Sequence, residues 1–128
     1  MDIRLDGRSA IITGGSAGIG KAIAQNFLSS GANVVIAARR TSKLEKAVTD
    51  ITAACENYPN CESRIKAISA DIRVAEECAK LVAFTESEFG DIDILINNAG
   101  TSQKGDFLEV SDEVWQDDLD LKLFAAIR

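Results

Sequence analysis

The chain has 128 residues, 46% of them apolar and 27% charged, which predicts one globular domain with a single core. Its formal net charge of −6 argues against a nucleic-acid partner. The lack of histidine excludes Ser-His-Asp and Cys-His catalysis, and three cysteines are too few for a structural zinc site, so we expect no metal.

Short apolar runs alternate with longer stretches whose apolar residues recur at helical spacing. This pattern predicts strands over residues 9–13, 33–38, 63–70 and 92–97. It also predicts helices over residues 21–30, 41–54 and 74–89, and a last helix that begins after residue 111. Thr41 or Ser42 and Ser111 are the expected hydroxyl caps, and Gly31 and Gly90 are expected to end the first and third helices.

Strands that alternate with helices predict an α/β fold, in which a parallel sheet is covered by helices on both faces. The first, second and fourth strands are continuous apolar runs and are expected to be buried on both sides. Arg64 and Lys66 alternate with apolar residues in the third strand, which indicates a sheet edge. The expected strand order is 3-2-1-4, half of a doubly wound arrangement.

The chain stops at Arg128 in the middle of its last predicted helix, without a cap. The fourth strand would then present an unpaired outer edge. We therefore expect residues 1–128 to form a single domain that is incomplete at its C-terminus.

A glycine-rich segment lies between the first strand and the first helix, and reads Thr-Gly-Gly-Ser-Ala-Gly-Ile-Gly from Thr13 to Gly20. Glycines at such a turn let the backbone approach a pyrophosphate, and the helix start offers free N–H groups to it. A flexible loop is the alternative interpretation. The position between a strand and a helix favours dinucleotide binding.

The spacing Thr-Gly-x-x-x-Gly-x-Gly resembles the cofactor motif of the short-chain dehydrogenase/reductase family. Two further family features follow in order: Asp71 after the third strand, and Asn-Asn-Ala-Gly from Asn97 to Gly100. The resemblance covers residues 5–128 and implies a Rossmann domain that binds NAD(P). It also implies an oxidoreductase that moves hydride between nicotinamide and a small carbonyl or alcohol substrate. The candidate cofactor contacts are Gly14, Ser16, Gly18, Ile19, Gly20, Arg39, Arg40, Asp71, Ile72, Asn98, Ala99 and Gly100.

The end of the second strand indicates which dinucleotide is bound. NAD enzymes place an acid about 20 residues past the glycines, to bind the ribose 2′-hydroxyl. No acid occurs there before Glu45, and Arg39 and Arg40 stand in its place. A guanidinium suits a 2′-phosphate, so NADP is the expected cofactor rather than NAD. Ala17 stands where NADP-specific members of the family often have a basic residue, and two solvated arginines are the alternative interpretation.

Asp71 and Ile72 are expected at the adenine, with the carboxylate accepting a hydrogen bond from the amino group and the isoleucine packing beside the ring. The alternative for Asp71 is a cap on the third helix. Asn98 is expected to replace backbone pairing where the fourth strand ends. Ala99 and Gly100 are small enough for the backbone to approach the cofactor.

The catalytic Ser and Tyr-x-x-x-Lys of the family are absent from this sequence, because its one tyrosine, Tyr58, is followed by Glu62 at the fourth position. The pattern of Trp115 and Leu119 onward places Lys122 where the family has an Asn that holds a water. Lys122 is the catalytic candidate, and a solvated lysine is the alternative. Residues 1–128 alone are expected to be inactive.

The resemblance implies a homo-dimer or homo-tetramer of the full-length protein, packed through the last helix, where Trp115, Leu119 and Leu123 share one side. No apolar run approaches the ~20 residues of a membrane helix, so we expect no membrane partner. No signal peptide is evident, so we expect a cytoplasmic location with reduced cysteines. A non-catalytic dinucleotide-binding or interaction module is the competing interpretation.

Overall fold

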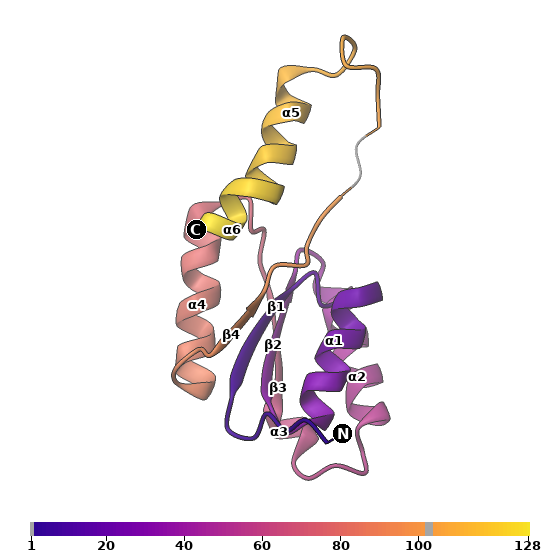
Figure 1. Ribbon diagram of the computed structural model, residues 1–128, viewed down its shortest axis with the longest axis vertical. Helices are drawn as coiled ribbons and strands as arrows, with labels where there is room; N and C mark the ends of the chain where they lie inside the picture. Colours follow the sequence, from indigo (N-terminus) through magenta and orange to yellow (C-terminus); the bar gives the residue numbers. More distant parts are fainter. Residues whose placement is uncertain (1, 102–103) are drawn as a thin grey trace.

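The computed structural model describes residues 2–101 and 104–128, and its strands form one parallel sheet (Figure 1). The strands are β1 (Ser9–Thr13), β2 (Asn33–Ala38), β3 (Ile65–Ser69) and β4 (Ile94–Ile96). They lie in the order β3-β2-β1-β4, with Ile11 paired to Val35 on one side and to Leu95 on the other. The predicted doubly wound α/β fold and its strand order are confirmed.

Helices cover both faces of the sheet. Figure 1 shows α1 and α2 on one face and α4 on the other, while the segment from α5 to α6 extends beyond the end of the sheet. The helical segments are α1 (Gly18–Ser29), α2 (Thr41–Ala54), α3 (Cys61–Arg64), α4 (Ala75–Phe89), α5 (Asp112–Leu119), the π-helical turn η1 (Asp120–Phe124) and α6 (Ala125–Ile127).

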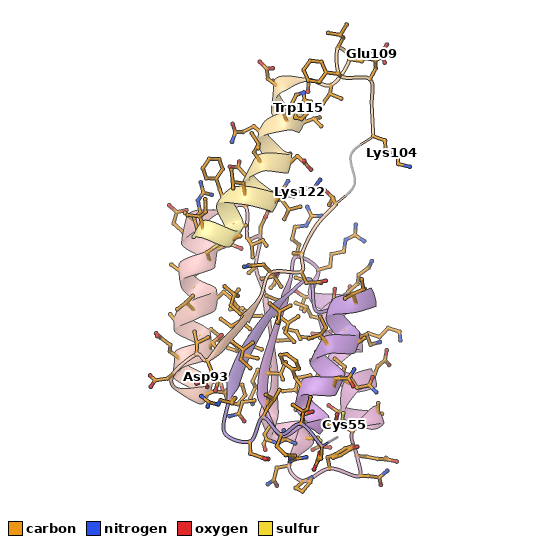
Figure 2. The ribbon with its side chains drawn as sticks, in the orientation of Figure 1. Cys55, Asp93, Lys104, Glu109, Trp115 and Lys122 are labelled. Carbon is orange, nitrogen blue, oxygen red and sulfur yellow. The ribbon has the colours of Figure 1, made fainter. Side chains whose placement is uncertain are left out.

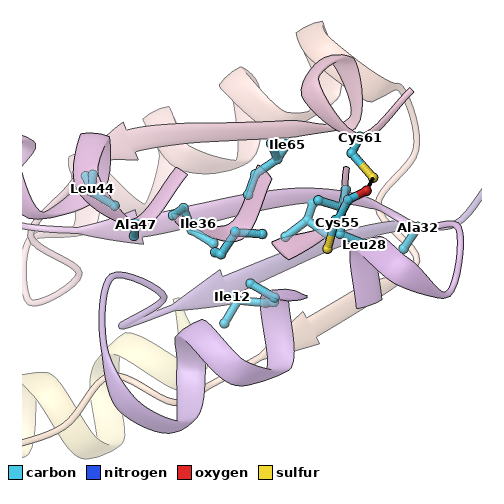
Figure 3. Close-up of a cluster of buried hydrophobic side chains, with 12 residues drawn as sticks. Ile12, Leu28, Ala32, Ile36, Leu44, Ala47, Cys55, Cys61 and Ile65 are labelled. Atoms are coloured by element: carbon cyan, nitrogen blue, oxygen red, sulfur yellow. Dashed lines mark hydrogen bonds between the residues drawn. The ribbon is translucent and has the colours of Figure 1, made fainter. Parts of the chain in front are cut away.

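The core divides into two clusters because neighbouring strand residues face opposite sides of the sheet. Ile12 and Ile36 pack with Leu28 of α1 on one face (Figure 3), and Ile11 packs with Leu81 of α4 on the other. Each such buried aliphatic side chain contributes about 1.5–3 kcal/mol to folding.

The third strand is shorter than predicted, because residues 61–64 form the helical turn α3. Arg64 was expected on the edge strand, and this prediction is wrong. Its guanidinium instead donates to the carbonyls of Leu28 and Ala32 at 2.9 and 2.7 Å, and to that of Pro59 at 2.9 Å. Two carbonyls at the end of α1 and one in the loop before α3 therefore outweigh the strand preference of this segment.

The fourth strand was expected to be buried on both sides, and this is also wrong. Leu95 is 51% exposed, and β4 has β1 as its only partner among the described residues. The chain leaves β4 toward α5, which extends away from the sheet (Figure 1), so the described part of the chain leaves Leu95 open, whereas Ile96 packs against the core.

The expected hydroxyl caps make no cap hydrogen bond. Helix α2 already includes Thr41, with extended Arg40 at the cap position, and the Ser111 side chain makes no cap bond although it stands at the cap position of α5. Gly31 and Gly90 do follow the ends of α1 and α4 closely, both with positive φ.

Asp93 connects the start of β1 to the loop before β4. Its carboxylate accepts a hydrogen bond from the Ser9 N–H at 2.9 Å and another from Arg8 at 3.0 Å. These bonds, the Ser9 N–H first, hold the pKa of Asp93 below its ordinary value.

We expect Asp93→Asn to lower the melting temperature at neutral pH. A lowered folded-state pKa stabilises the protein above the unfolded pKa, and that stabilisation is lost as pH falls through the folded value. The difference in melting temperature between the parent and the variant should therefore shrink below about pH 4. A difference that stays constant from pH 7 to pH 3 would show that the charge of Asp93 contributes nothing.

Candidate cofactor site

A cavity of about 280 Å³ opens at the carboxyl ends of the strands. In open parallel sheets this is the edge at which ligands bind. The segments at the ends of all four strands form part of its wall, and so do residues of α5 and η1. The lining residues are Thr13, Gly14, Ala37, Ala38, Arg39, Ala70, Asp71, Ile72, Arg73, Ala99, Gly100, Thr101, Asp117, Asp118 and Leu121.

Six of the predicted cofactor contacts line this cavity: Gly14, Arg39, Asp71, Ile72, Ala99 and Gly100. The other six lie in the neighbouring loops or at the start of α1: Ser16, Gly18, Ile19, Gly20, Arg40 and Asn98. The structure thus gathers the predicted contacts at one end of the sheet, although the segments that supply them lie far apart in the sequence.

No side chain caps the start of α1. Ala17 stands at its cap position without a side-chain hydrogen bond, and the first turn contains no acidic residue. The first N–H groups of a helix lack partners within the helix and lie at the positive end of its dipole. A side chain at Gly18 would meet no atom within 4 Å, so the space beside this turn is open to a ligand. These features fit a diphosphate group.

The Thr13 hydroxyl joins the glycine-rich turn to the end of β4. Its oxygen accepts hydrogen bonds from the Asn98 and Ala99 N–H groups, both at 3.1 Å, and its hydroxyl donates to the Ile96 carbonyl at 3.3 Å. The Asn98 side chain donates in turn to the carbonyls of Thr13 and Gly14, at 3.1 and 3.2 Å. Asn98 therefore holds the turn in place through its amide group.

We expect Thr13→Val to destabilise the protein by about 1–2 kcal/mol, because the half-buried Ala99 N–H loses its acceptor and the Asn98 N–H keeps only the Ile96 carbonyl, at 3.0 Å. Thr13→Ser keeps the hydroxyl and should lose much less. Chemical denaturation of both variants measures the difference. Equal losses in the two variants would show that the methyl group matters and the hydroxyl does not.

Arg39 lies at the cavity and Arg40 beside it, both exposed. The main chain of Arg39 is fixed by the Ser69 hydroxyl, which donates to its carbonyl at 2.9 Å. No carboxylate follows β2 directly, because Arg39, Arg40 and Thr41 are the next residues. The end of β2 thus presents cationic side chains to the solvent and to the cavity.

Asp71 is bound by Arg73, a contact that the sequence did not predict. The Arg73 side chain donates to both carboxylate oxygens, with Nη2 2.7 Å from Oδ2, and the Arg73 N–H bonds Oδ1 at 3.1 Å. Hydrogen bonding by Arg73 holds the pKa of Asp71 below its usual value, so this carboxylate is ionised at neutral pH. Asp71 does not cap α4, because Val74 occupies that position. The spacing of two residues between Asp71 and Arg73 is the sequence feature that could have indicated this pair.

Lys122 lies in the π-helical turn η1 (Figure 2). Its ammonium is 2.8 Å from an oxygen of Asp118. Asp118 and Leu121 line the cavity, but Lys122 is not among the described lining residues. Lys122 is therefore adjacent to the cavity and is held by an acid that belongs to it. A π-helical turn within an α-helix is often found at a functional site.

Comparisons with known proteins agree with this geometry. Residues 8–128 match the family model for short chain dehydrogenase. Over 114 residues the chain is 39% identical to the dehydrogenase/reductase SDR family member 4 of Caenorhabditis elegans, a match that covers 88% of this chain and 41% of the relative. It is 33% identical over 130 residues to an uncharacterized oxidoreductase of Bacillus subtilis, with 100% of this chain and 45% of the relative covered.

Among solved structures, L-sorbose reductase from Gluconobacter frateurii, complexed with NADPH and L-sorbose, is similar to this chain with a TM-score of 0.89 and 36% identity. The match covers 99% of this chain and 46% of that one. The chain belongs to the short-chain dehydrogenase/reductase family of oxidoreductases, and it spans less than half the length of the curated relatives it matches. Within residues 2–101 and 104–128, no helix has both the length and the apolar character needed to cross a membrane.

Proposed function

We propose that this chain is the cofactor-binding part of an NADP-dependent oxidoreductase that acts on a small carbonyl or alcohol. The observation that carries the proposal is the cavity at the carboxyl ends of the strands, with Arg39 at the end of β2 where an NAD enzyme has an acid. The NADPH complex of L-sorbose reductase supports a nicotinamide dinucleotide as the cofactor.

The residues at the cavity suit the successive parts of the dinucleotide. The uncapped start of α1 would bind the diphosphate through its N–H groups, with Ser16 and Ile19 beside it. Arg39, supported by Arg40, would bind the 2′-phosphate. Asp71 would accept a hydrogen bond from the adenine amino group, while Ile72 packs against the ring.

The nicotinamide end would lie against Ala99 and Gly100, whose small size lets the backbone come close. NADPH, when bound, supplies the hydride. Lys122 is our candidate for holding a water near the substrate, because Asp118 fixes its ammonium next to the cavity. The Ser and the Tyr-x-x-x-Lys that the family uses for proton transfer do not occur in this sequence, and the whole protein would have to supply them.

We also propose that the whole protein is a cytoplasmic homo-dimer or homo-tetramer that packs through the segment from α5 to α6. Trp115, Leu119 and Leu123 of this segment are 43%, 45% and 49% exposed. Contact with a second copy would bury this apolar surface. Analytical ultracentrifugation of the whole protein measures the oligomeric state, and a monomer at micromolar concentration would contradict this part of the proposal.

The test of the function is the oxidation of NADPH by the whole protein with a panel of small ketones, aldehydes and ketoses. We expect absorbance of the reduced nicotinamide to fall with at least one substrate. A control panel without protein corrects for chemical oxidation. Tight NADPH binding without turnover of any substrate in either direction would instead favour a non-catalytic dinucleotide-binding module.

A further inference from the structure

The side chain of Arg73 joins two segments that are remote in sequence. Its guanidinium binds Asp71, which follows β3, and its Nη1 is 3.4 Å from a carboxylate oxygen of Asp117 in α5. Arg128, the residue after α6, donates to the Arg73 carbonyl at 2.8 Å, so residues 112–128 contact this turn twice. Asp71, Arg73 and Asp117 all line the cavity.

The contacts on Asp71 leave part of its carboxylate open. Both of its oxygens accept hydrogen bonds from Arg73, yet 27% of the Asp71 side chain and 29% of the Arg73 side chain remain exposed at the cavity. Three donors of Arg73 bind it, the main-chain N–H, Nε and Nη2, and Nε is shared between the two oxygens. A carboxylate has about four acceptor positions, so one further donor can bind it. Because the Arg73 N–H and guanidinium bind the same carboxylate, they fix its orientation. The direction of the acceptor position that remains is therefore fixed too.

We propose that Arg73 is a positioning residue that aims the Asp71 carboxylate at the amino group of adenine and holds α5 against this end of the cavity. The inference rests on the proposed function, because it needs a dinucleotide in the cavity. In this role Arg73 makes the site prefer adenine over bases that lack an amino donor. An unfixed carboxylate would rotate and be hydrated, and would distinguish such bases less well.

The experiment compares two dinucleotides in the whole protein: NADPH and its hypoxanthine analogue, in which a carbonyl oxygen replaces the amino group of adenine. Dissociation constants are measured by calorimetry. The parent protein should bind NADPH about tenfold more tightly, the ratio that one hydrogen bond to a charged group supplies. Arg73→Met should reduce this ratio to about threefold or less, and Arg73→Lys should restore part of it.

Arg4→Met is the matched control. Arg4 also binds an aspartate two residues away, Asp6, at 2.8 Å, and neither residue lines the cavity. This variant should keep the parent ratio. Asp117→Asn leaves the Arg73 bond to Asp71 in place and removes the one α5 carboxylate that pairs with Arg73 among the described residues. We expect a smaller reduction of the ratio, which provides a second test if Arg73→Met does not fold.

The outcomes separate this inference from the function on which it rests. If the parent binds neither dinucleotide, the proposed function fails. If the parent binds both equally, or if Arg73→Met weakens both by the same factor, the cofactor site stands and the role of Arg73 is overturned. An unchanged ratio in Asp117→Asn would overturn the part of the inference that concerns α5.

Discussion

Gly14→Val should abolish NADPH binding and lower the free energy of unfolding by at least about 3 kcal/mol. Gly14 has a φ of 67°, a conformation that a β-branched residue rarely adopts. A Cβ atom there would also lie 2.9 Å from the Ala99 Cα and 2.9 Å from the Asn98 side-chain nitrogen. The valine would therefore push the glycine-rich turn away from the end of β4, and the cavity would lose the wall against which the cofactor is expected to lie.

Gly7→Val is the matched control for this prediction. Gly7 has a similar φ of 74°, but a Cβ atom there would meet nothing within 4 Å. The control should show only the cost of backbone strain, about 1–2 kcal/mol, with NADPH binding intact. Calorimetric titration and denaturant unfolding measure both quantities, and Gly14→Ala provides a milder change if the valine variant does not fold. A folded Gly14→Val protein that binds NADPH like the parent would contradict the assignment of this turn.

Arg64→Ala should destabilise the protein by about 3 kcal/mol, although the side chain is remote from the cavity. The guanidinium donates to the Leu28, Ala32 and Pro59 carbonyls, and thereby joins the end of α1 to the loop before α3. Alanine would leave these carbonyls without their charged donor. The rest of the loop is held locally, with the Cys61 thiol donating to the Cys55 carbonyl at 2.9 Å (Figure 3).

Two variants isolate the geometry of this contact. Arg64→Lys keeps the charge, but one ammonium group cannot reproduce the fork that reaches both sides, so only part of the stability should return. Arg4→Ala removes an exposed arginine and should have a much smaller effect. The midpoint of urea unfolding compares all three variants. A loss in Arg64→Ala no larger than in Arg4→Ala would contradict a structural role for Arg64.

The sequence predicted the architecture well, because strand and helix periods are local properties. The spans of β1 and β2 agree with the predicted ranges, and the strand order followed from the apolar character of the strands and the polar third strand. The boundaries of β3 and β4 were less accurate. In β3, Arg64 responds to carbonyls more than 30 residues away along the chain. In β4, only Ile94–Ile96 of the predicted range pair with β1.

Motif spacing placed the predicted contacts at the carboxyl ends of the strands, where the structure has its cavity, because the glycines, Asp71 and the segment after β4 all follow strands. It did not reveal Thr13 as the acceptor for Asn98 and Ala99, or Arg73 as the partner of Asp71 and Asp117. In three of the four pairs the partners are 40 to 90 residues apart in the sequence. No local pattern encodes such a contact.

If Arg39 binds the 2′-phosphate of NADP, the protein should distinguish NADPH from NADH. Dissociation constants for both dinucleotides, in the parent protein and in Arg39→Ala, measure this directly. We expect the parent to bind NADPH well ahead of NADH. Arg39→Ala should weaken NADPH binding by about 1.5–3 kcal/mol, the range for a hydrogen bond to a charged group, and should leave NADH binding nearly unchanged. Equal dissociation constants for the two dinucleotides in the parent protein would show that Arg39 does not bind a 2′-phosphate.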